Sequence, residues 1–239
     1  NFANSRTYGD WPNGRSRAQL NAQSSLLGAH RVAGNYSPEI GFTLAQDFMP
    51  AVNATSAAQA DGSQLISWNS VTGATGYYLW TMGFKENGRG QGGDMIWWSS
   101  SASQQFGGAL WDWIAPATVA RLITQRVVLP PSQTSCAMPA EVKQAAPQFM
   151  MGNLYAYGPE ANFAYPPRPA NARTPWHPIW TARARFRSHT GWLVGGPQMM
   201  GGNADEQQDA NNSEDSSADP NRCRRRGGLL GRALRIPGC

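Results

Sequence analysis

Three acidic residues lie next to aromatic side chains and are the first candidates for chemistry. Asp94 precedes the run MIWW, Asp112 lies in LWDWI, and Glu160 lies in YGPEANF. Glycoside hydrolases place two carboxylates across a sugar-binding cleft, so Asp112 and Glu160 make a carbohydrate-active enzyme one hypothesis. The alternative, which we favour, is that Asp112 caps or solvates a strand end and that Glu160 is a turn residue.

Other catalytic and metal-binding patterns do not occur in the sequence. The Gly-rich stretch GRGQGG (88–93) lacks the Lys and Ser/Thr of a phosphate-binding loop, and no GxSxG nucleophile motif occurs. The histidines and cysteines are not at metal-ligand spacing: His30, His177, His189, Cys136, Cys223 and Cys239. A bridge between Cys223 and Cys239, a partner for Cys136 upstream and three free thiols all stay open. We expect no catalytic residue, no metal and no cofactor.

Tryptophans provide a stronger signal for binding. Trp97 and Trp98 are adjacent and therefore point to opposite sides of a strand, so one can be buried while the other is exposed. Trp111 and Trp113 in WDW share a face. Exposed indole rings stack on sugars or pack against protein partners. The alternative is that these rings fill a core that is poor in Ile and Leu.

Arginines at alternate positions provide a second binding signal. Arg183, Arg185 and Arg187 in TARARFR form one positive stripe, while Trp180 and Phe186 face inward. The functional interpretation is contact with an acidic glycan or lipid headgroups. The alternative is an exposed strand whose charges discourage edge-to-edge pairing.

Composition favours a turn-rich β protein. Only 15% of the 239 residues are charged, whereas the chain contains 26 Gly, 17 Pro and 10 Trp. Residues 1–202 carry 14 basic and 9 acidic groups, residues 203–221 carry six acids, and residues 222–239 carry six Arg. This balance argues against a nucleic-acid partner, and it leaves peripheral membrane contact through the basic tail as an option.

Seven strands and one helix are expected in the central part of the chain. Aromatic or alternating runs between turn residues predict the strands: 52–58, 64–70, 76–84, 94–100, 126–137, 149–157 and 179–188. GAHRVAG and EIGFTLAQDFM supply two earlier strands. Val119, Leu122 and Ile123 recur at helical spacing after Pro116, so a helix is predicted at 116–125.

Two short motifs resemble those of fibronectin type III modules. Trp68 in the second strand and ATGYYLW at the start of the third resemble the B and C strands, where a Trp and a Tyr pack between two sheets. NLYAYGPEANFAYPP is similar to the penultimate strand and its loop. The resemblance implies an immunoglobulin/fibronectin type III-like β-sandwich over about residues 50–190, with the helix as an insertion and with Trp68 and Tyr78 in the core.

The chain as a whole also resembles a group of Gram-negative bacterial proteins without an established activity. GNYSPEIGFTL, RVVLPPSQTSC and YGPEANFAYPPRPAN carry this resemblance. It implies a periplasmic, outer-membrane-associated or secreted location.

Four regions and a binding role follow from these observations. We expect an N-terminal polar segment (1–49), the sandwich (50–195), a disordered acidic linker (196–221) and a basic amphipathic tail (222–239). The expected function is a non-enzymatic binding or assembly module for a protein or an envelope polysaccharide. The alternatives are a carbohydrate-active enzyme or its accessory carbohydrate-binding domain, and a structural spacer of a larger chain. The sequence does not indicate an oligomeric state.

Overall fold

Strands form where aromatic and β-branched runs lie between turn residues. The computed structural model describes residues 8–11, 20–21, 23–35, 37–88, 92–104, 108–171 and 173–196. The predicted basic tail, nearly all of the predicted acidic linker, and Cys223 and Cys239 lie outside these residues. In the described part of the chain, no helix has the length and apolar character needed to cross a membrane.

Two antiparallel sheets contain seven of the described strands. One sheet has the order β3 (Ala54–Ala58), β4 (Gln64–Trp68), β7 (Ser135–Met138). The other has the order β6 (Gly93–Ser99), β5 (Gly76–Glu86), β8 (Phe149–Tyr165), β9 (Trp180–Leu193). The prediction of a mainly β chain is therefore confirmed.

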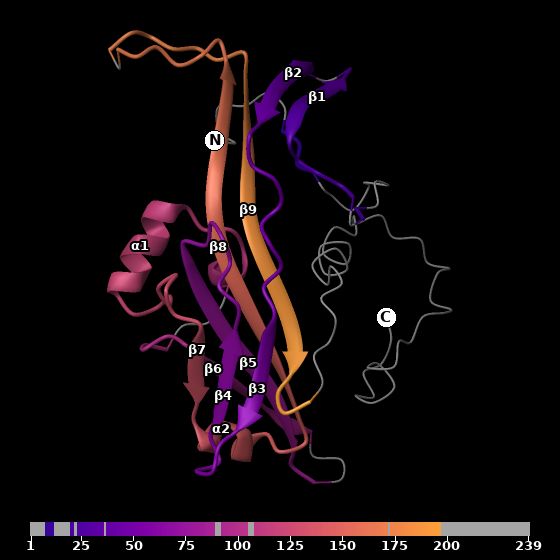
Figure 1. Cartoon of the computed structure of the whole chain (residues 1–239), viewed down its shortest axis with the longest axis vertical. Coiled ribbons are helices and arrows are strands. Elements are labelled where there is room, and N and C mark those ends of the chain that lie inside the picture. Colours follow the sequence, from indigo (N-terminus) through magenta and orange to yellow (C-terminus); the bar gives the residue numbers. More distant parts are fainter. Residues whose placement is uncertain are drawn as a thin grey trace. The chain divides into compact units, whose positions relative to one another are not determined.

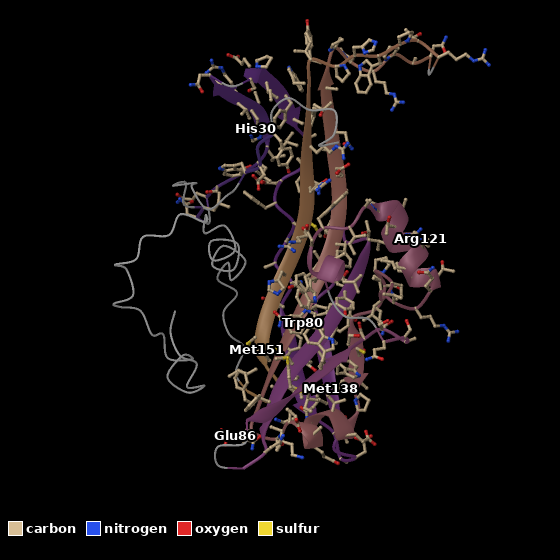
Figure 2. All side chains as sticks on the ribbon, turned by 180° about the vertical axis from the view of Figure 1, so that it is seen from behind. His30, Trp80, Glu86, Arg121, Met138 and Met151 are labelled. Carbon is tan, nitrogen blue, oxygen red and sulfur yellow. The ribbon has the colours of Figure 1, made fainter. Side chains whose placement is uncertain are left out.

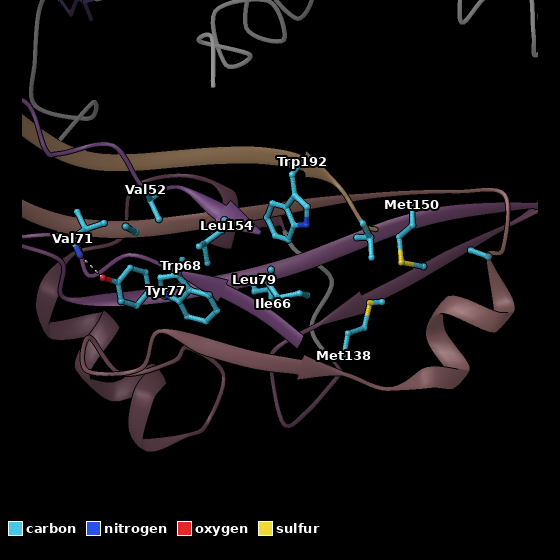
Figure 3. Close-up of a cluster of buried hydrophobic side chains, with 14 residues drawn as sticks. Val52, Ile66, Trp68, Val71, Tyr77, Leu79, Met138, Met150, Leu154 and Trp192 are labelled. Atoms are coloured by element: carbon cyan, nitrogen blue, oxygen red, sulfur yellow. Dashed lines mark hydrogen bonds between the residues drawn. The ribbon is translucent and has the colours of Figure 1, made fainter. Parts of the chain in front are cut away.

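An inner core lies between these two sheets. Ile66 and Trp68 of β4 are buried with Tyr77 and other side chains of the four-stranded sheet (Figure 3). The Trp68 and Tyr77 ring centroids are 5.6 Å apart. The Tyr77 hydroxyl accepts a hydrogen bond from the Val71 backbone N–H at 2.9 Å, which satisfies a buried donor at the start of the turn.

Trp192 of β9 occupies this core because its neighbour on β8 has no side chain. A Cβ atom at Gly152 would lie 2.4 Å from the Trp192 ring, far inside van der Waals contact. The indole is almost completely buried. Gly152 and Trp192 are therefore a matched pair, and a larger residue at 152 would displace the ring.

The outer face of the four-stranded sheet is also covered. Helix α1 (Pro116–Thr124) begins with a proline whose fixed φ suits the first helical turn, and it packs the fully buried Val119 against this face. A 3-10 helix (Gly108–Trp111) adds Leu110. The second helix, α2 (Ala140–Ala145), lies between β7 and β8. The central strands therefore bury side chains on both faces.

One strand of the sequence prediction is wrong in extent. The strand predicted at 126–137 is formed only at Ser135–Met138, because Arg126 has a left-handed φ of 57° and Pro130 and Pro131 have no N–H to donate. Within that stretch, Leu129 forms a single bridge with Tyr77.

The prediction that Trp68 and Tyr78 are buried is confirmed, but the tyrosine that packs with Trp68 is Tyr77. Adjacent residues of a strand point to opposite faces, so Tyr77 enters the inner core and Tyr78 is buried on the outer face. Both tyrosines are core residues, but Tyr78 belongs to a core that the sandwich resemblance does not imply.

Strands β8 and β9 continue beyond the other strands of their sheet (Figure 1). β5 pairs with β8 only as far as Gly76 opposite Tyr157, whereas β8 and β9 pair on to Tyr165 opposite Trp180. We call residues 160–185 the arm: the far part of β8, the loop 166–179 and the first residues of β9. The loop is the orange segment that joins the ends of β8 and β9 in Figure 1.

One face of the arm packs against a separate hairpin. Strands β1 (Gly28–Gly34) and β2 (Ser37–Leu44) pair with each other, and Phe42 of β2 stacks on Phe163 of the arm with ring centroids 4.7 Å apart. His30 of β1, labelled in Figure 2, also stacks on Phe42, with ring centroids 5.3 Å apart. This stack supports a two-stranded ribbon that would be marginally stable alone.

Candidate binding surface

Two of the predicted tryptophans belong to an aromatic cluster on the outer face of the sheet. Trp97 of β6 stacks on Trp80 of β5 at 4.4 Å, and Trp111 lies 5.4 Å from Trp80 and 5.5 Å from Trp97. Trp98 points to the opposite side and packs against the inner core. Trp97 and Trp98 are thus both half-buried, and each extends a different core.

Trp111 ends the 3-10 helix and Trp113 follows it, so the two residues do not lie on one strand. Trp113 instead contacts the base of the arm. Its indole Nε1–H donates to the carbonyl oxygen of Gly158 at 3.1 Å. The Arg185 guanidinium lies over the Trp113 ring, 4.6 Å from the centroid. This contact places the segment before α1 against the arm.

Arg185 and Arg187 of the predicted stripe are engaged within the chain. Arg185 Nε is 2.9 Å from Glu160 Oε2 across the β8–β9 pair. Arg187 donates to the backbone carbonyl of Trp111 and lies over the Tyr155 ring at 5.6 Å. These two arginines link β9 to Trp111 and Trp113, which precede α1.

Glu160 is held in its ionised form. Burial alone would raise its pKa, but hydrogen bonds from Arg185 and Asn162 and the charges of Arg183 and Arg185 together lower the pKa of Glu160. A glycosidase general acid needs the opposite, a raised pKa. Asp112, the other acid considered, is exposed and accepts a hydrogen bond from the Trp113 backbone N–H at 2.6 Å. Both roles favoured from the sequence are wrong in detail: Asp112 follows the 3-10 helix and not a strand, and Glu160 lies within β8 opposite Arg185 and not in a turn.

Exposed apolar and basic side chains occur together at the far end of the arm. Tyr165 is 55% exposed and Ile179 is 60% exposed, and the Ile179 N–H donates to the Tyr165 carbonyl at 2.7 Å. Arg168 and Arg173 of the intervening loop are exposed, as is Arg183 on the arm itself. Figure 2 shows the side chains of this loop standing away from the ribbon of β8 and β9.

The loop between β8 and β9 also forms a pocket of about 230 Å³. Five residues line it: Arg168, Pro169, Asn171, Thr174 and Trp176. The Trp176 indole Nε1–H donates to the Pro166 carbonyl at 3.0 Å, and the Arg168 guanidinium lies 5.5 Å from the centroid of the Trp176 ring. The Trp176 indole and the Arg168 guanidinium therefore both line this pocket and contact each other.

Metal and thiol chemistry gain no support from the described residues. No three His, Cys, Asp or Glu side chains among them gather closely enough to hold a metal ion. Cys136 of β7 is a free thiol, and burial raises its pKa, so it is a weak nucleophile at neutral pH.

Sequence reasoning missed the arm as a surface. The pattern that indicates it is the alternation of apolar residues at 161, 163 and 165, matched by Trp180, Ala182 and Ala184 on the partner strand. Pro159 hid this pattern, because proline is avoided inside a paired strand. Here Pro159 lies where the pairing of β8 and β9 is irregular, so the strand continues past it.

Comparisons with known proteins add no family or relative. No protein-family model matches the chain, and neither the curated proteins nor the solved structures give a match.

Proposed function

We propose that this chain is a non-enzymatic binding or assembly module that contacts a protein or a surface polymer through its arm. The observation that carries the proposal is the exposure of Tyr165 and Ile179 beside arginines at the far end of a ribbon. Large apolar side chains exposed together in a polar rim are typical of interaction sites. A ribbon that extends beyond the sandwich contributes little to the core, so its length is better explained by contact with a partner.

The proposed scaffold is a fibronectin type III-like sandwich. Its support is the order of strands, with the first, second and fifth strands of the sandwich (β3, β4, β7) in one sheet and the remaining four in the other. The packing of Trp68 on Tyr77 between the sheets gives further support. Sandwiches of this kind present binding residues on loops and on strands at one end, as the arm does here.

The proposed setting is extracytoplasmic, in the periplasm, at the outer membrane or outside the cell. It rests on the resemblance of the sequence to Gram-negative envelope proteins. Fractionation of cells that produce the full protein, with detection in the periplasmic, membrane and culture fractions, checks this part. Recovery only in the cytoplasm would contradict it.

The lowered pKa of Glu160 does not suit the general-acid role in the enzymatic alternative. Its carboxylate is ionised and bound to Arg185, so it cannot donate a proton to a leaving group at neutral pH. The spacer alternative predicts a different result, namely that no partner depends on the end of the arm.

Retention of envelope components by the purified chain tests the function. The wild-type protein and Ile179→Ser are immobilised and exposed to solubilised envelope fractions and to purified envelope polysaccharide. Leu65→Ser is the matched control, because Leu65 is an exposed apolar residue on β4, 37% exposed, and is not part of the arm. We expect Ile179→Ser alone to lose the retained material. Equal retention by all three proteins, or none by the wild type, would reject the arm as the contact.

A further inference from the structure

The pocket in the loop 166–179 lies in a strongly one-sided region of charge. Residues 161–204 contain no Asp or Glu but five arginines, of which Arg168 lines the pocket and Arg173 lies on the same loop. Arg168 is the one charged residue among the five that line the pocket. An anionic group is therefore favoured, and a neutral ligand would gain nothing from this charge.

One aromatic residue, Trp176, is among those that line the pocket, and its position is fixed. The Trp176 ring is half-buried and is held by the hydrogen bond from its Nε1–H to the Pro166 carbonyl. Indole rings stack on the apolar faces of flat rings such as pyranoses. The Arg168 guanidinium lies over one face of this ring, 5.5 Å from its centroid, so a ligand at the ring also lies within reach of a planar, bidentate cation.

A turn supplies neutral hydrogen-bonding groups on the same pocket. The Asn171 side-chain oxygen accepts from the Arg173 N–H at 3.0 Å, and the Asn171 carbonyl accepts from the Thr174 N–H at 3.1 Å. These bonds orient the turn and leave the Asn171 side-chain NH₂ and the Thr174 hydroxyl as donors. Amide and hydroxyl groups beside an aromatic ring are suited to sugar hydroxyls.

We propose that this pocket binds the carboxylate-bearing sugar of an acidic polysaccharide. Arg168 receives the carboxylate as a bidentate partner, Trp176 stacks on the sugar ring, and Asn171 and Thr174 bond its hydroxyls. The pocket of about 230 Å³ is smaller than the usual site for a drug-sized ligand and suits one sugar unit of a chain. This inference rests on the proposed binding function and names the chemistry of its partner.

Two other anionic polymers fit the pocket less well. Nucleic acid binding draws its affinity from many phosphate contacts, whereas Arg185 and Arg187 are already engaged with Glu160 and Trp111. An anionic lipid surface would contact the exposed Tyr165 and Ile179 and would not need a pocket. A single oriented carboxylate is the ligand that uses the pocket itself.

Calorimetric titration of the full chain tests the proposal. The probes are an oligogalacturonate and a neutral galactose oligomer of equal length. We expect measurable binding of the oligogalacturonate only. Arg168→Gln should weaken it about tenfold or more, and Arg168→Lys should lose part of the affinity because it keeps charge without the planar fork. Arg183→Gln is the control, since it removes the same charge from an exposed arginine outside the pocket, and it should change the affinity less than about twofold.

Several outcomes would overturn the proposal. Equal binding of the neutral oligomer, equal loss in Arg183→Gln, or tighter binding of an oligothymidylate or of phosphatidylglycerol vesicles would each do so. Circular dichroism and the thermal midpoint of each variant show whether it is folded, and Trp176→Phe tests the ring with a smaller change than deletion. If Ile179→Ser still abolishes envelope retention while oligogalacturonate does not bind, this inference fails and the proposed function stands.

Discussion

The two packed sheets, which we call the sandwich, and the arm share strands β8 and β9 but differ in how those strands are held. In the sandwich, β8 is paired on both sides and buried on both faces. In the arm, the described residues of β8 pair with β9 alone, and the contacts beyond the ribbon include the Phe42–Phe163 stack and the Arg185–Trp113 contact. The comparison shows that continuous hydrogen bonding along two strands does not imply uniform stability, because stability follows the buried surface around them.

The largest effect is expected from a change inside the sandwich. Trp192→Ala removes a fully buried indole next to Gly152, which leaves a cavity and should lower the free energy of unfolding by about 3–5 kcal/mol. Chemical denaturation followed by circular dichroism measures the loss, and Trp192→Phe should cost less. A loss below about 1 kcal/mol would show that Trp192 does not hold the sandwich together.

A smaller and local effect is expected from the arm. Phe163→Ala removes the stack on Phe42 and should cost about 1 kcal/mol. We expect faster amide hydrogen exchange at 160–165 and 180–185 with little change in the sandwich strands. If exchange rises equally in β4 and β5, the arm and the sandwich open as one unit and the distinction between them is wrong.

The base of the arm should respond to pH. The pKa of Glu160 is lowered in the folded chain, so its contribution to stability is complete above the usual glutamate pKa of about 4.3 and is lost as the pH falls through the lower folded value. Because Arg185 is partly exposed, the pair is worth about 0.2–1 kcal/mol. Amide hydrogen exchange of the arm at pH 6 and at pH 3, in the wild type and in Glu160→Gln, measures this pH-dependent contribution to stability. Identical pH dependence in both proteins would exclude Glu160 as the cause.

The smallest effect is expected at Cys136, which reports on the sandwich only. Burial raises the pKa of this thiol, so iodoacetamide should react slowly with it at pH 7.5. In a Cys223→Ser, Cys239→Ser background, Phe163→Ala should leave the rate unchanged while Trp192→Ala increases it. An increased rate in Phe163→Ala would link the arm to the sandwich.

Sequence patterns predicted local structure well and long-range contacts poorly. The helix near Pro116 and the strand around Trp68 are visible because spacing and turn residues are local signals. The choice between Tyr77 and Tyr78 depends on which face of β5 meets the other sheet, and two adjacent tyrosines carry no local information about that.

The predicted binding residues illustrate the same limit. Trp97 and Arg187 are residue types that often bind ligands. In the folded chain, however, Trp97 stacks on Trp80 and Arg187 donates to the Trp111 carbonyl, and both partners come from other segments. The residues at the far end of the arm were missed for the opposite reason. Their exposure follows from β8 and β9 extending past β5, which is a property of strand pairing and not of any single segment.

The irregular pairing between Tyr157 and Glu160 sets the phase of the whole arm. Tyr157 pairs with Arg187 and Glu160 pairs with Arg185, so three residues along β8 span the same length as two along β9. Strand β8 therefore carries one extra residue here. Gly158 lies in this irregular step, and a side chain there would clash because a Cβ atom would lie 2.3 Å from the Met49 sulfur. Without the extra residue, the alternation of β8 would be inverted beyond this point, and Phe163 would point to the side that now carries Glu160. A single inserted residue thus determines which side of the ribbon is aromatic and which is charged.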